Sequence, residues 1–594
     1  MLKGESILIY DIETDGLDTS KSKAKWFGAY SYLDNKYYTY DYNDFNKIKV
    51  LSKRHKHMVG FNNIEFDDMI LENQHKIYFR YNNIIDLLKC AKQKLSLIGL
   101  NPKNFKLKTI IDMLKISSVT KGDIDYKIFQ KDKWTDEQIK EISEYLGKDI
   151  IMTKDLFEWF YTQFKPLSEL LNKNDREKMM YIKASPASLS SRIITNLSGI
   201  KNEFRTKEEM DGMKSQTFAG GHHVENKEPM YKGNIVSVDF NSAYPHAIIM
   251  GNLCSPSSEG WGSNNYYDLK GSYNKEEGKI EQSLNKLLSM KIEASIKKDM
   301  IRKKSYKLVL NSFYGTLGNK CFKTFYNPTA AGDCCSMVRT WLKKLAKILS
   351  IEGFEIIYGF TDNVMVKIPE QSSKEELIYI VNKFVEEIKK TIPNPKDSFG
   401  MEVEKELKFI WFIAKNCYVW VDKDDKVGYK RTVFDKNTPK IIMDVFNKYM
   451  TPKIIKELDI NFTIKEISEQ IRDIIKDNVE LASTEFDVKD ISTYKSLTSQ
   501  HYDISKAYGA GKHFLIPNTK NLGVGRSKSN KRKVGVRYCT IKEFKDNGLT
   551  VDEIDISKLL EHLKPFYHTK KKNWSSKEHN GILIPNPTIE VVKI

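Results

Sequence analysis

Cysteine is scarce in this sequence and is never spaced as in a zinc ribbon or an iron–sulfur motif. The chain has 7 cysteines in 594 residues and contains no CxxC pair. The adjacent Cys334 and Cys335 fall in a predicted helix, where a disulfide between neighbours would be strained. These absences argue against a disulfide-stabilised secreted domain and against a cysteine-bound metal centre. We therefore expect reduced cysteines and a cytoplasmic protein.

Long apolar stretches are absent, and acidic residues are outnumbered by basic ones. No apolar run approaches the roughly 20 residues that cross a membrane, and no signal peptide precedes the first predicted strand. We expect a soluble protein without a membrane segment. The 78 acidic residues stand against 96 lysines and arginines, which gives a net charge of +18. Such a surplus favours a polyanionic partner, because neutralised phosphates release their counterions. A lysine-rich, AT-biased genome is the alternative source of the same excess.

Acidic residues near the N-terminus are placed as in a metal site. A short apolar run, predicted as a buried strand, leads into Asp11-x-Glu13, whose side chains share one face of the strand. Carboxylates in this position suit hard cations such as Mg²⁺, although solvated turn acids are the ordinary alternative. Asp67 opens a predicted helix, and Asp149 follows Tyr145 by one helical turn on the same face. Four acids in matching contexts favour a metal site.

Two further acids, Asp239 and Asp362, are tied to predicted strands. Residues 234–238 predict a buried strand that delivers Asp239 at its end. Residues 354–358 and 364–368 predict two strands around a tight turn, with Asp362 at the tip. There Asp362 can face Asp239 across a sheet. A core strand with an incidental acid is the alternative for Asp239.

A basic stretch lies between these two acids. Residues 284–310 predict long helical structure, and Lys307 shares one helical face with Asn311 and Tyr314. A solvated helix face accounts for most of its lysines.

Taken together, these segments resemble the motifs of family B DNA polymerases. DFNSAYP from Asp239 resembles motif A, KLVLNSFYG from Lys307 resembles motif B, and YGFTDN around Asp362 resembles motif C. The N-terminal acids resemble the three motifs of DEDD exonucleases, in the subtype with a tyrosine in the third. The resemblance covers roughly residues 5 to 430. It implies a multidomain α/β and α+β fold, in which an RNase H-like 3′→5′ exonuclease domain precedes a right-hand polymerase.

The resemblance also implies where the domains lie in a chain too long for a single core. The expected domains are the exonuclease at 1–170, a linker at 171–230, palm segments at 231–262 and 323–440, fingers at 263–322 and a thumb at 441–594. The gaps between the motifs look too short for the two insertions of the protein-primed branch. We expect a compact phage or mobile-element replicase without a built-in processivity clamp.

For the polymerase centre, the resemblance implies two Mg²⁺ ions, for which Mn²⁺ can substitute. Asp239, Asp362 and the backbone carbonyl of Phe240 would be their ligands, and Lys307 would bind the triphosphate and protonate the leaving pyrophosphate. Tyr244 would lie beneath the sugar and exclude a ribose hydroxyl. The full set implied to contact the nucleotide is Phe240, Ser242, Ala243, Tyr244, Lys291, Lys298, Lys307, Asn311 and Tyr314.

Motif C departs from the usual YGDTDS. Phe360 replaces its first acid and Asn363 replaces its final serine. Losing that carboxylate should weaken metal affinity, shift the metal preference or reduce synthesis. Because the remaining motifs are retained, we expect an active polymerase.

For the exonuclease, the resemblance assigns two metal ions to Asp11, Glu13, Asp67 and Asp149, and makes Tyr145 the residue that orients the attacking water. Neighbouring Asp15 and Asp68 are expected to be solvated. Lys121 lies in KGDIDY, which resembles a segment of protein-primed phage polymerases that assists the exonuclease. A basic turn residue is the equally ranked alternative for Lys121.

Several further residues are candidates to contact DNA. Phe218, Gly220 and Gly221 resemble the YxGG element that grips the template backbone, with a plain glycine turn as the alternative. Asn63 precedes the second exonuclease acid. Lys415 and Tyr418 resemble the KxY region that contacts the primer, although Asn416 occupies the usual lysine position.

The function expected from the sequence is a template-directed DNA polymerase with a proofreading 3′→5′ exonuclease. Its partners would be primer–template DNA and dNTPs, with a primer protein or replication accessory proteins as further candidates. We expect a monomer that works in the host cytoplasm if it is encoded by a phage. The alternatives are a DNA-binding exonuclease with a degenerate polymerase centre and a non-catalytic, basic DNA-binding scaffold.

Overall fold

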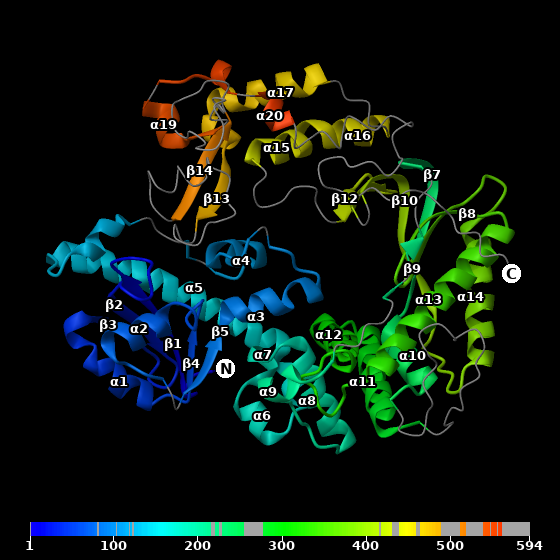
Figure 1. The fold of residues 1–594 in the computed structure, drawn as a ribbon, viewed down its shortest axis with the longest axis horizontal. Helices are drawn as coiled ribbons and strands as arrows, with labels where there is room; N and C mark the ends of the chain where they lie inside the picture. Colours follow the sequence, from blue (N-terminus) through cyan, green and yellow to red (C-terminus); the bar gives the residue numbers. More distant parts are fainter. Residues whose placement is uncertain are drawn as a thin grey trace. The chain divides into compact units, whose positions relative to one another are not determined.

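The structure is a computed structural model of the chain, and it divides into two compact units (Figure 1). The first unit comprises Met1–Gly220, Ser242–Val338 and Lys389–Phe399, and the second comprises Gly221–Asn241, Arg339–Ile388 and Gly400–Ile594. Within them the structure describes residues 2–79, 82–102, 104–117, 119–120, 124–214, 220–221, 223–224, 228–254, 277–414, 417–430, 439–458, 464–488, 511–517, 538–546, 548–554 and 556–560. Among the described helices, none is both long and apolar enough to cross a membrane.

The first unit begins with a five-stranded sheet in the order β3-β2-β1-β4-β5. Its strands are β1 (Ile7–Thr14), β2 (Ala24–Ser31), β3 (Lys36–Asp41), β4 (His57–Gly60) and β5 (Asn83–Asp86). Strand β1 is antiparallel to β2 and parallel to β4, so the sheet is mixed. It is the central strand, and its apolar run is buried as predicted.

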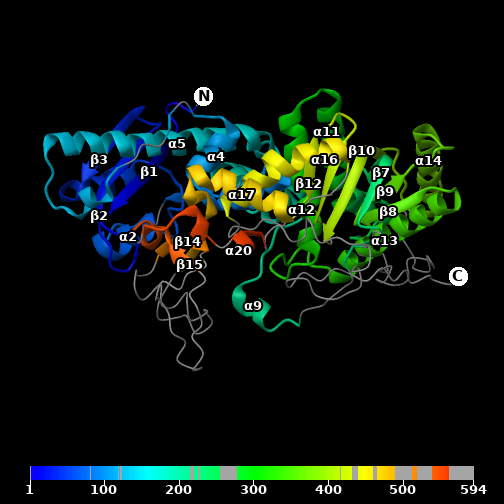
Figure 2. The same ribbon diagram turned by 90° about the horizontal axis from the view of Figure 1, so that it is seen from above.

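Helices cover both faces of this sheet (Figure 2). On one face Leu8, Tyr10 and Ile12 of β1 pack with side chains of α1 (Asn46–Lys53) and α2 (Asp67–His75). On the other face Trp26 packs with Leu146 of the long helix α5 (Asp136–Ser168). Because side chains alternate along a strand, Asp11 and Glu13 lie on the face opposite Tyr10 and Ile12, which is the face that α5 covers.

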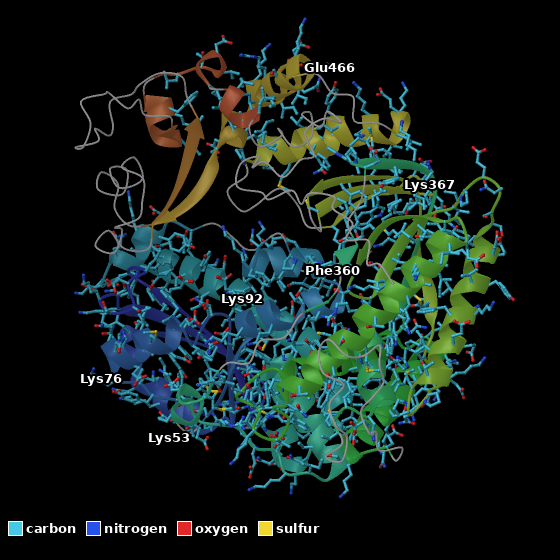
Figure 3. All side chains as sticks on the ribbon, turned by 45° about the vertical axis from the view of Figure 1, so that its right-hand side comes forward. Lys53, Lys76, Lys92, Phe360, Lys367 and Glu466 are labelled. Carbon is cyan, nitrogen blue, oxygen red and sulfur yellow. The ribbon has the colours of Figure 1, made fainter. Side chains whose placement is uncertain are left out.

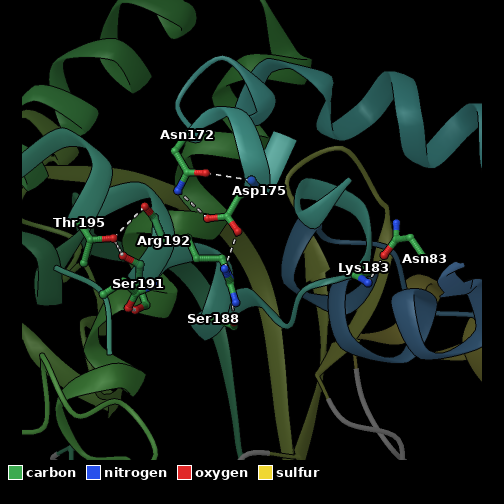
Figure 4. A network of polar contacts seen from close by, with 9 residues as sticks. Asn83, Asn172, Asp175, Lys183, Ser188, Ser191, Arg192 and Thr195 are labelled. Carbon is green, nitrogen blue, oxygen red and sulfur yellow. Dashed lines mark hydrogen bonds and ion pairs between the residues drawn. The ribbon is translucent and has the colours of Figure 1, made fainter. Parts of the chain in front are cut away.

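The remainder of the first unit is helical. Its helices are α3 (Leu87–Lys94), α4 (Leu107–Leu114), α6 (Lys173–Glu177), α7 (Met180–Lys183), α8 (Pro186–Ser198), α9 (Lys207–Asp211), α10 (Ala243–Gly251), α11 (Lys279–Ile296), α12 (Met300–Leu317) and the first part of α13 (Pro328–Ile351). A buried carboxylate, Asp175, ties α6 to α8, since it accepts hydrogen bonds from Asn172 at 2.9 Å and from Arg192 at 2.5 Å (Figure 4).

The predicted long helical structure over residues 284–310 is confirmed, and it consists of two helices because the chain turns in its middle. Helix α11 ends at Ile296 and α12 begins at Met300. Between them Lys298 has a positive φ of 56°, and the Asp299 side chain accepts a hydrogen bond from the backbone N–H of Arg302 at 3.0 Å. The left-handed backbone of Lys298 is typical of the end of a helix, here α11. The Asp299 side chain is the N-cap that begins α12.

The second unit contains a seven-stranded antiparallel sheet in the order β12-β11-β10-β7-β9-β8-β6. Its strands are β6 (His223–Val224), β7 (Met230–Phe240), β8 (Glu355–Phe360), β9 (Asn363–Lys367), β10 (Met401–Ala414), β11 (Cys417–Asp422) and β12 (Val427–Lys430). The predicted strand before Asp239 and the predicted hairpin around Asp362 are both confirmed as β7 and β8–β9.

The C-terminal part of the second unit packs on one face of this sheet. Phe409 and Trp411 of β10 share a core with α15 (Lys440–Val445), α16 (Thr451–Glu457) and α17 (Ile464–Asp477). These helices lie within residues 440–594, and the same stretch also forms a three-stranded sheet of β13 (Thr484–Val488), β14 (Gly511–Pro517) and β15 (Tyr538–Thr540).

Candidate active sites

Three of the predicted N-terminal acids meet. Asp11, Glu13 and Asp149 each offer a carboxylate oxygen, and the three oxygens lie within 4.8 Å of one another. A glycine allows this approach: Gly28 of β2 pairs with Asp11, and a Cβ at Gly28 would lie 2.6 Å from the Leu146 side chain of α5. The absence of a side chain at Gly28 therefore lets α5 bring Asp149 down onto β1.

The fourth predicted acid, Asp67, borders this cluster. It is the first residue of α2, and its carboxylate accepts a hydrogen bond at 3.2 Å from the backbone N–H of Ile12, between the two acids of β1. Burial, with the nearby charge of Asp68, raises the pKa of Asp67. A hard divalent cation binds carboxylate oxygens, and its charge offsets the repulsion between carboxylates that are buried close together. The residues present therefore fit a divalent metal.

Tyr145 is buried on α5, one turn before Asp149. Its hydroxyl lies 2.9 Å from the hydroxyl of Tyr126, which belongs to the short 3₁₀ helix Tyr126–Gln130 and is 60% exposed. No sequence pattern pointed to a role for Tyr126, although it is the last residue of the KGDIDY segment. Lys121 of the same segment lies outside the described residues.

Two predictions near this cluster are wrong. Asn63, a predicted DNA contact, is fully buried and donates a hydrogen bond at 2.7 Å to the hydroxyl of Tyr10. The Tyr10 hydroxyl in turn donates to Asp68. Asp68 is therefore not solvated, and burial raises its pKa to about 6. Both side chains are engaged in fixing the start of α2 against β1, so Asn63 presents no surface to a DNA strand.

The two acids predicted from the central motifs lie at neighbouring strand ends. The register of β7 and β9 pairs Asp239 with Asn363, the residue after Asp362. The backbone N–H of Phe240 donates to the carbonyl of Asp362 at 3.0 Å. Thr361 at the tip has a positive φ of 62°, which turns the chain sharply between the strands. The sheet therefore brings together two acids that are far apart in the sequence.

The unusual residues of motif C have defined places in the sheet, and Figure 3 labels Phe360. Phe360 pairs with Asn363, whose side-chain oxygen accepts a hydrogen bond at 3.2 Å from the backbone N–H of Phe360. The Phe360 ring packs against the buried aromatic cluster of the sheet, with the ammonium of Lys430 5.4 Å from its centroid. Asn363 thus closes the hairpin tip, and the space of the missing carboxylate is filled by an aromatic ring.

A third acid stands beside Asp239. The register of β10 and β7 places Glu402 directly opposite Asp239, and Glu402 is exposed. Directly opposed residues of antiparallel strands project to the same face of the sheet. The sequence analysis missed Glu402, because only the register of β10 on β7 relates the two positions.

The glycine element before motif A adjoins the same hairpin. A Cβ at Gly221 would lie 3.3 Å from the backbone Cα of Thr361, so this position approaches the hairpin tip closely. Gly220 is exposed, and a Cβ there would meet nothing within 4 Å. Phe218, which completes the element, lies outside the described residues, as does Lys415.

In the first unit, the later residues of motif A contact residues of α11 and α12. Ser242 has a positive φ of 52°, and its hydroxyl accepts a hydrogen bond from Lys291 of α11 at 2.7 Å. The Tyr244 and Tyr314 rings lie against each other, with centroids 4.7 Å apart. Lys291 thus lies beside motif A.

The predicted common face of Lys307, Asn311 and Tyr314 is confirmed, because these residues are exposed or half-buried while Leu308, Val309, Leu310 and Phe313 are buried. Lys298 lies in the turn between α11 and α12, more than one helical turn from Lys291.

Three predicted contact residues are buried instead. Ala243 is 2% exposed, and the Phe240 ring packs against Trp341, so any ligand contact from either must come through the backbone. The predicted primer contact of Tyr418 is wrong for this structure. Its side chain is 1% exposed and packs against Tyr358 and Phe412, and burial raises the pKa of its hydroxyl. Tyr418 is a core residue of the sheet.

Comparisons with known proteins agree with this architecture. The family model described as the RNase H superfamily matches residues 8–161. The solved structure of the family B DNA polymerase from the archaeon Pyrobaculum calidifontis has a TM-score of 0.61 and 14% identity, and the likeness covers 95% of this chain and 78% of that one. At this identity the likeness concerns the fold, and it confirms an RNase H-like domain with a family B polymerase fold.

Curated relatives are similar over shorter stretches. DNA polymerase 1 of Saccharolobus solfataricus is 30% identical over 215 residues, which are 33% of this chain and 22% of that protein. The DNA polymerase of Thermococcus gorgonarius is 22% identical over 411 residues, which are 65% of this chain and 51% of that protein. The chain thus spans about half or less of the length of these relatives.

The polymerase part of the sequence has its own family match. The family model described as DNA polymerase family B matches residues 161–296 and 274–513, which together exceed half of the chain. This stretch contains the paired strands that carry Asp239 and Asp362. The chain therefore belongs to DNA polymerase family B.

Proposed function

We propose that this protein is a template-directed DNA polymerase that adds dNTPs to a primer 3′ end, with a 3′→5′ proofreading exonuclease. The observation that carries the proposal is the position of Asp239 and Asp362 at adjacent strand ends of the antiparallel sheet. The domain boundaries expected from the sequence are proposed unchanged. Extension of a primed template, run with each dNTP omitted in turn, tests the proposal: synthesis should stop at the first template position that requires the missing nucleotide.

For the polymerase centre we propose that Asp239, Asp362 and the carbonyl of Phe240 hold two Mg²⁺ ions, with Mn²⁺ as a substitute. When bound, the ions supply charge stabilisation to the attacking and leaving oxygens. A backbone hydrogen bond holds the two strand ends together beforehand. The hydrogen bond from the Phe240 N–H to the Asp362 carbonyl fixes the two strand ends, so neither acid has to move far to share a cation.

We propose that the nucleotide is bound by residues of α10, α11 and α12. Lys307 and Lys291 would contact the triphosphate, and Lys307 would donate a proton to the leaving pyrophosphate. Tyr244 would lie beneath the sugar, where its ring excludes a ribose hydroxyl by sterics. The remaining proposed contacts are those of Ser242, Ala243, Asn311 and Tyr314, with Lys298 as an outer contact.

For the exonuclease we propose that Asp11, Glu13, Asp67 and Asp149 hold the metal ions. Tyr145 would orient the water that attacks the terminal phosphodiester, and Lys121 would offset the charge of that phosphate. The contact between the Tyr145 and Tyr126 hydroxyls supports this role, since it restricts where the Tyr145 hydroxyl can point. Tyr126 is then a positioning residue.

Replacing Tyr126 by phenylalanine should slow release of nucleotides from single-stranded DNA by roughly two- to tenfold, because a typical hydrogen bond contributes about 0.5–1.5 kcal/mol. Primer extension should be unchanged. Tyr37→Phe, at an exposed tyrosine of β3, is the matched control. Equal nucleotide-release rates for the Tyr126 variant and the wild type would contradict the positioning role.

A second candidate function is an exonuclease whose polymerase centre has decayed to DNA binding. Phe360, which fills the position of the usual first acid of motif C, is the observation in its favour. The two functions make different predictions for the variant that restores a carboxylate.

On our proposal the wild type already extends primers, and Phe360→Asp lowers the metal concentration for half-maximal extension by roughly three- to tenfold. The register puts residue 360 on the face of Asp239, where an added charge increases affinity for a divalent cation. Phe360→Asn is the uncharged control. A wild type without synthesis and a large gain on Phe360→Asp would support the decayed centre instead.

We further propose primer–template DNA and dNTPs as partners, and a monomer that works in the cytoplasm. The finer assignment to a phage or mobile-element replicase related to the protein-primed branch rests on KGDIDY and on the glycine element at Gly220 and Gly221. Parallel reactions with a DNA primer, an RNA primer and a candidate priming protein would test it. Label transferred covalently to protein supports this branch, and extension of nucleic acid primers alone contradicts it.

A further inference from the structure

Two adjacent cysteines of α13 each contact a tyrosine of the proposed nucleotide pocket. The Cys335 sulfur lies 2.9 Å from the hydroxyl of Tyr314 on α12. The Cys334 thiol donates to the backbone carbonyl of Tyr244 on α10 at 3.6 Å. Both cysteines are buried, with 1% and 0% of their surface exposed. Helix α13 therefore holds both tyrosines through sulfur contacts from consecutive residues.

The two tyrosines also contact each other. Their ring centroids are 4.7 Å apart with an angle of 42° between the planes. Both rings are half-buried, so each has one part packed and one part open. Burial and the hydrogen bond to Cys335 keep the pKa of Tyr314 above its usual value, so its hydroxyl stays protonated. A change in the tilt of the Tyr314 ring would displace the Tyr244 ring.

We propose that Cys335 is a positioning residue that sets the selectivity of the pocket for deoxyribose over ribose. The inference rests on the proposed polymerase function. Cys335 fixes the hydroxyl end of the Tyr314 ring, and the Tyr314 ring fixes the Tyr244 ring beneath the sugar. Rejection of one extra hydroxyl depends on how closely a ring approaches the sugar carbon, so a loosely held ring discriminates less.

The test compares Cys335→Ala with Cys335→Ser in steady-state single-nucleotide extension with dNTP and rNTP. The alanine variant should raise the KM for dNTP about fivefold with little change in kcat, and should lower the dNTP/rNTP ratio of kcat/KM by a similar factor. The serine variant keeps a hydroxyl that can form a hydrogen bond with Tyr314. It should therefore restore most of the wild-type KM for dNTP and most of the wild-type dNTP/rNTP ratio. Cys321→Ala, at a half-buried cysteine outside this arrangement, is the matched control.

If Cys335 only fills space in the core, its variants should give different kinetic results. If both Cys335 variants lower kcat while the dNTP/rNTP ratio stays at the wild-type value, the inference is wrong. Tyr314→Phe removes the other partner without altering α13, and should lower the ratio as much as Cys335→Ala. The two changes together should not be additive, since they delete one interaction. Full additivity overturns the inference as well.

The outcome also separates this inference from the function on which it rests. A wild type that incorporates neither nucleotide refutes the proposed polymerase function, and the inference with it. A wild type that incorporates dNTP, together with an alanine variant of unchanged ratio, refutes the inference alone. Nucleotide release from single-stranded DNA should stay at the wild-type rate in every cysteine variant, which reports that the chain is folded.

Discussion

Asp239→Asn and Asp362→Asn should each reduce primer extension by at least about a thousandfold, which corresponds to about 4 kcal/mol of lost transition-state stabilisation. The strand ends of β7 and β8–β9 supply only these two motif acids, because Phe360 occupies the third position. Removing one charge from such a pair leaves a single motif carboxylate where two cations must be shared. Asparagine keeps the size of the side chain, so the fold should be retained.

The control for these variants is Asp424→Asn, which lies in the exposed turn between β11 and β12 of the same sheet. It should extend primers at the wild-type rate. Nucleotide release from single-stranded DNA should persist in all three proteins, because the N-terminal cluster belongs to the other compact unit. Wild-type extension by either centre variant would show that the two acids do not form the polymerase centre.

The double variant Asp11→Ala with Glu13→Ala should abolish nucleotide release and leave primer extension intact. It removes two of the three carboxylates whose oxygens lie within 4.8 Å of one another. The expected loss is on the order of a thousandfold or more, since only Asp67 and Asp149 would remain to hold a cation. Release of labelled nucleotide from a single-stranded substrate is the measurement.

The same double variant loses activity but should not lose stability. Without a bound cation the acids repel one another, and removing two of them relieves that repulsion. The thermal midpoint in the presence of a chelator should therefore be equal to or higher than that of the wild type. Glu72→Gln on the exposed side of α2 is the matched control.

Persistent release of nucleotide from single-stranded DNA by the double variant would mean that hydrolysis does not use this cluster.

Local sequence patterns sufficed for the elements that carry the acids. The apolar run before Asp11, the strand before Asp239 and the hairpin around Asp362 each combine a buried run with a polar end, and each is present as predicted. The common face of Lys307, Asn311 and Tyr314 follows from helical spacing alone. These features are determined by residues that are close together in the sequence, so they can be predicted from the sequence pattern.

Features that depend on distant neighbours were missed. Glu402 comes opposite Asp239 only through the register of β10 on β7. Tyr126 meets Tyr145 because a 3₁₀ helix packs beside α5. Asn63 and Tyr418 are polar side chains whose burial depends on partners such as Tyr10 and Tyr358 from other strands. No periodicity of the surrounding residues distinguishes these buried positions from exposed ones.

We infer that Asp239 and Asp362 form a working centre even though the first acid of motif C is absent. The most direct test is single-nucleotide extension with the chain carrying Asp11→Ala and Glu13→Ala, so that digestion cannot mask synthesis. We expect this protein to incorporate only the nucleotide complementary to the template. We expect no product when Asp362→Asn is introduced as well. Absence of product in both proteins, or equal product from both, would contradict it.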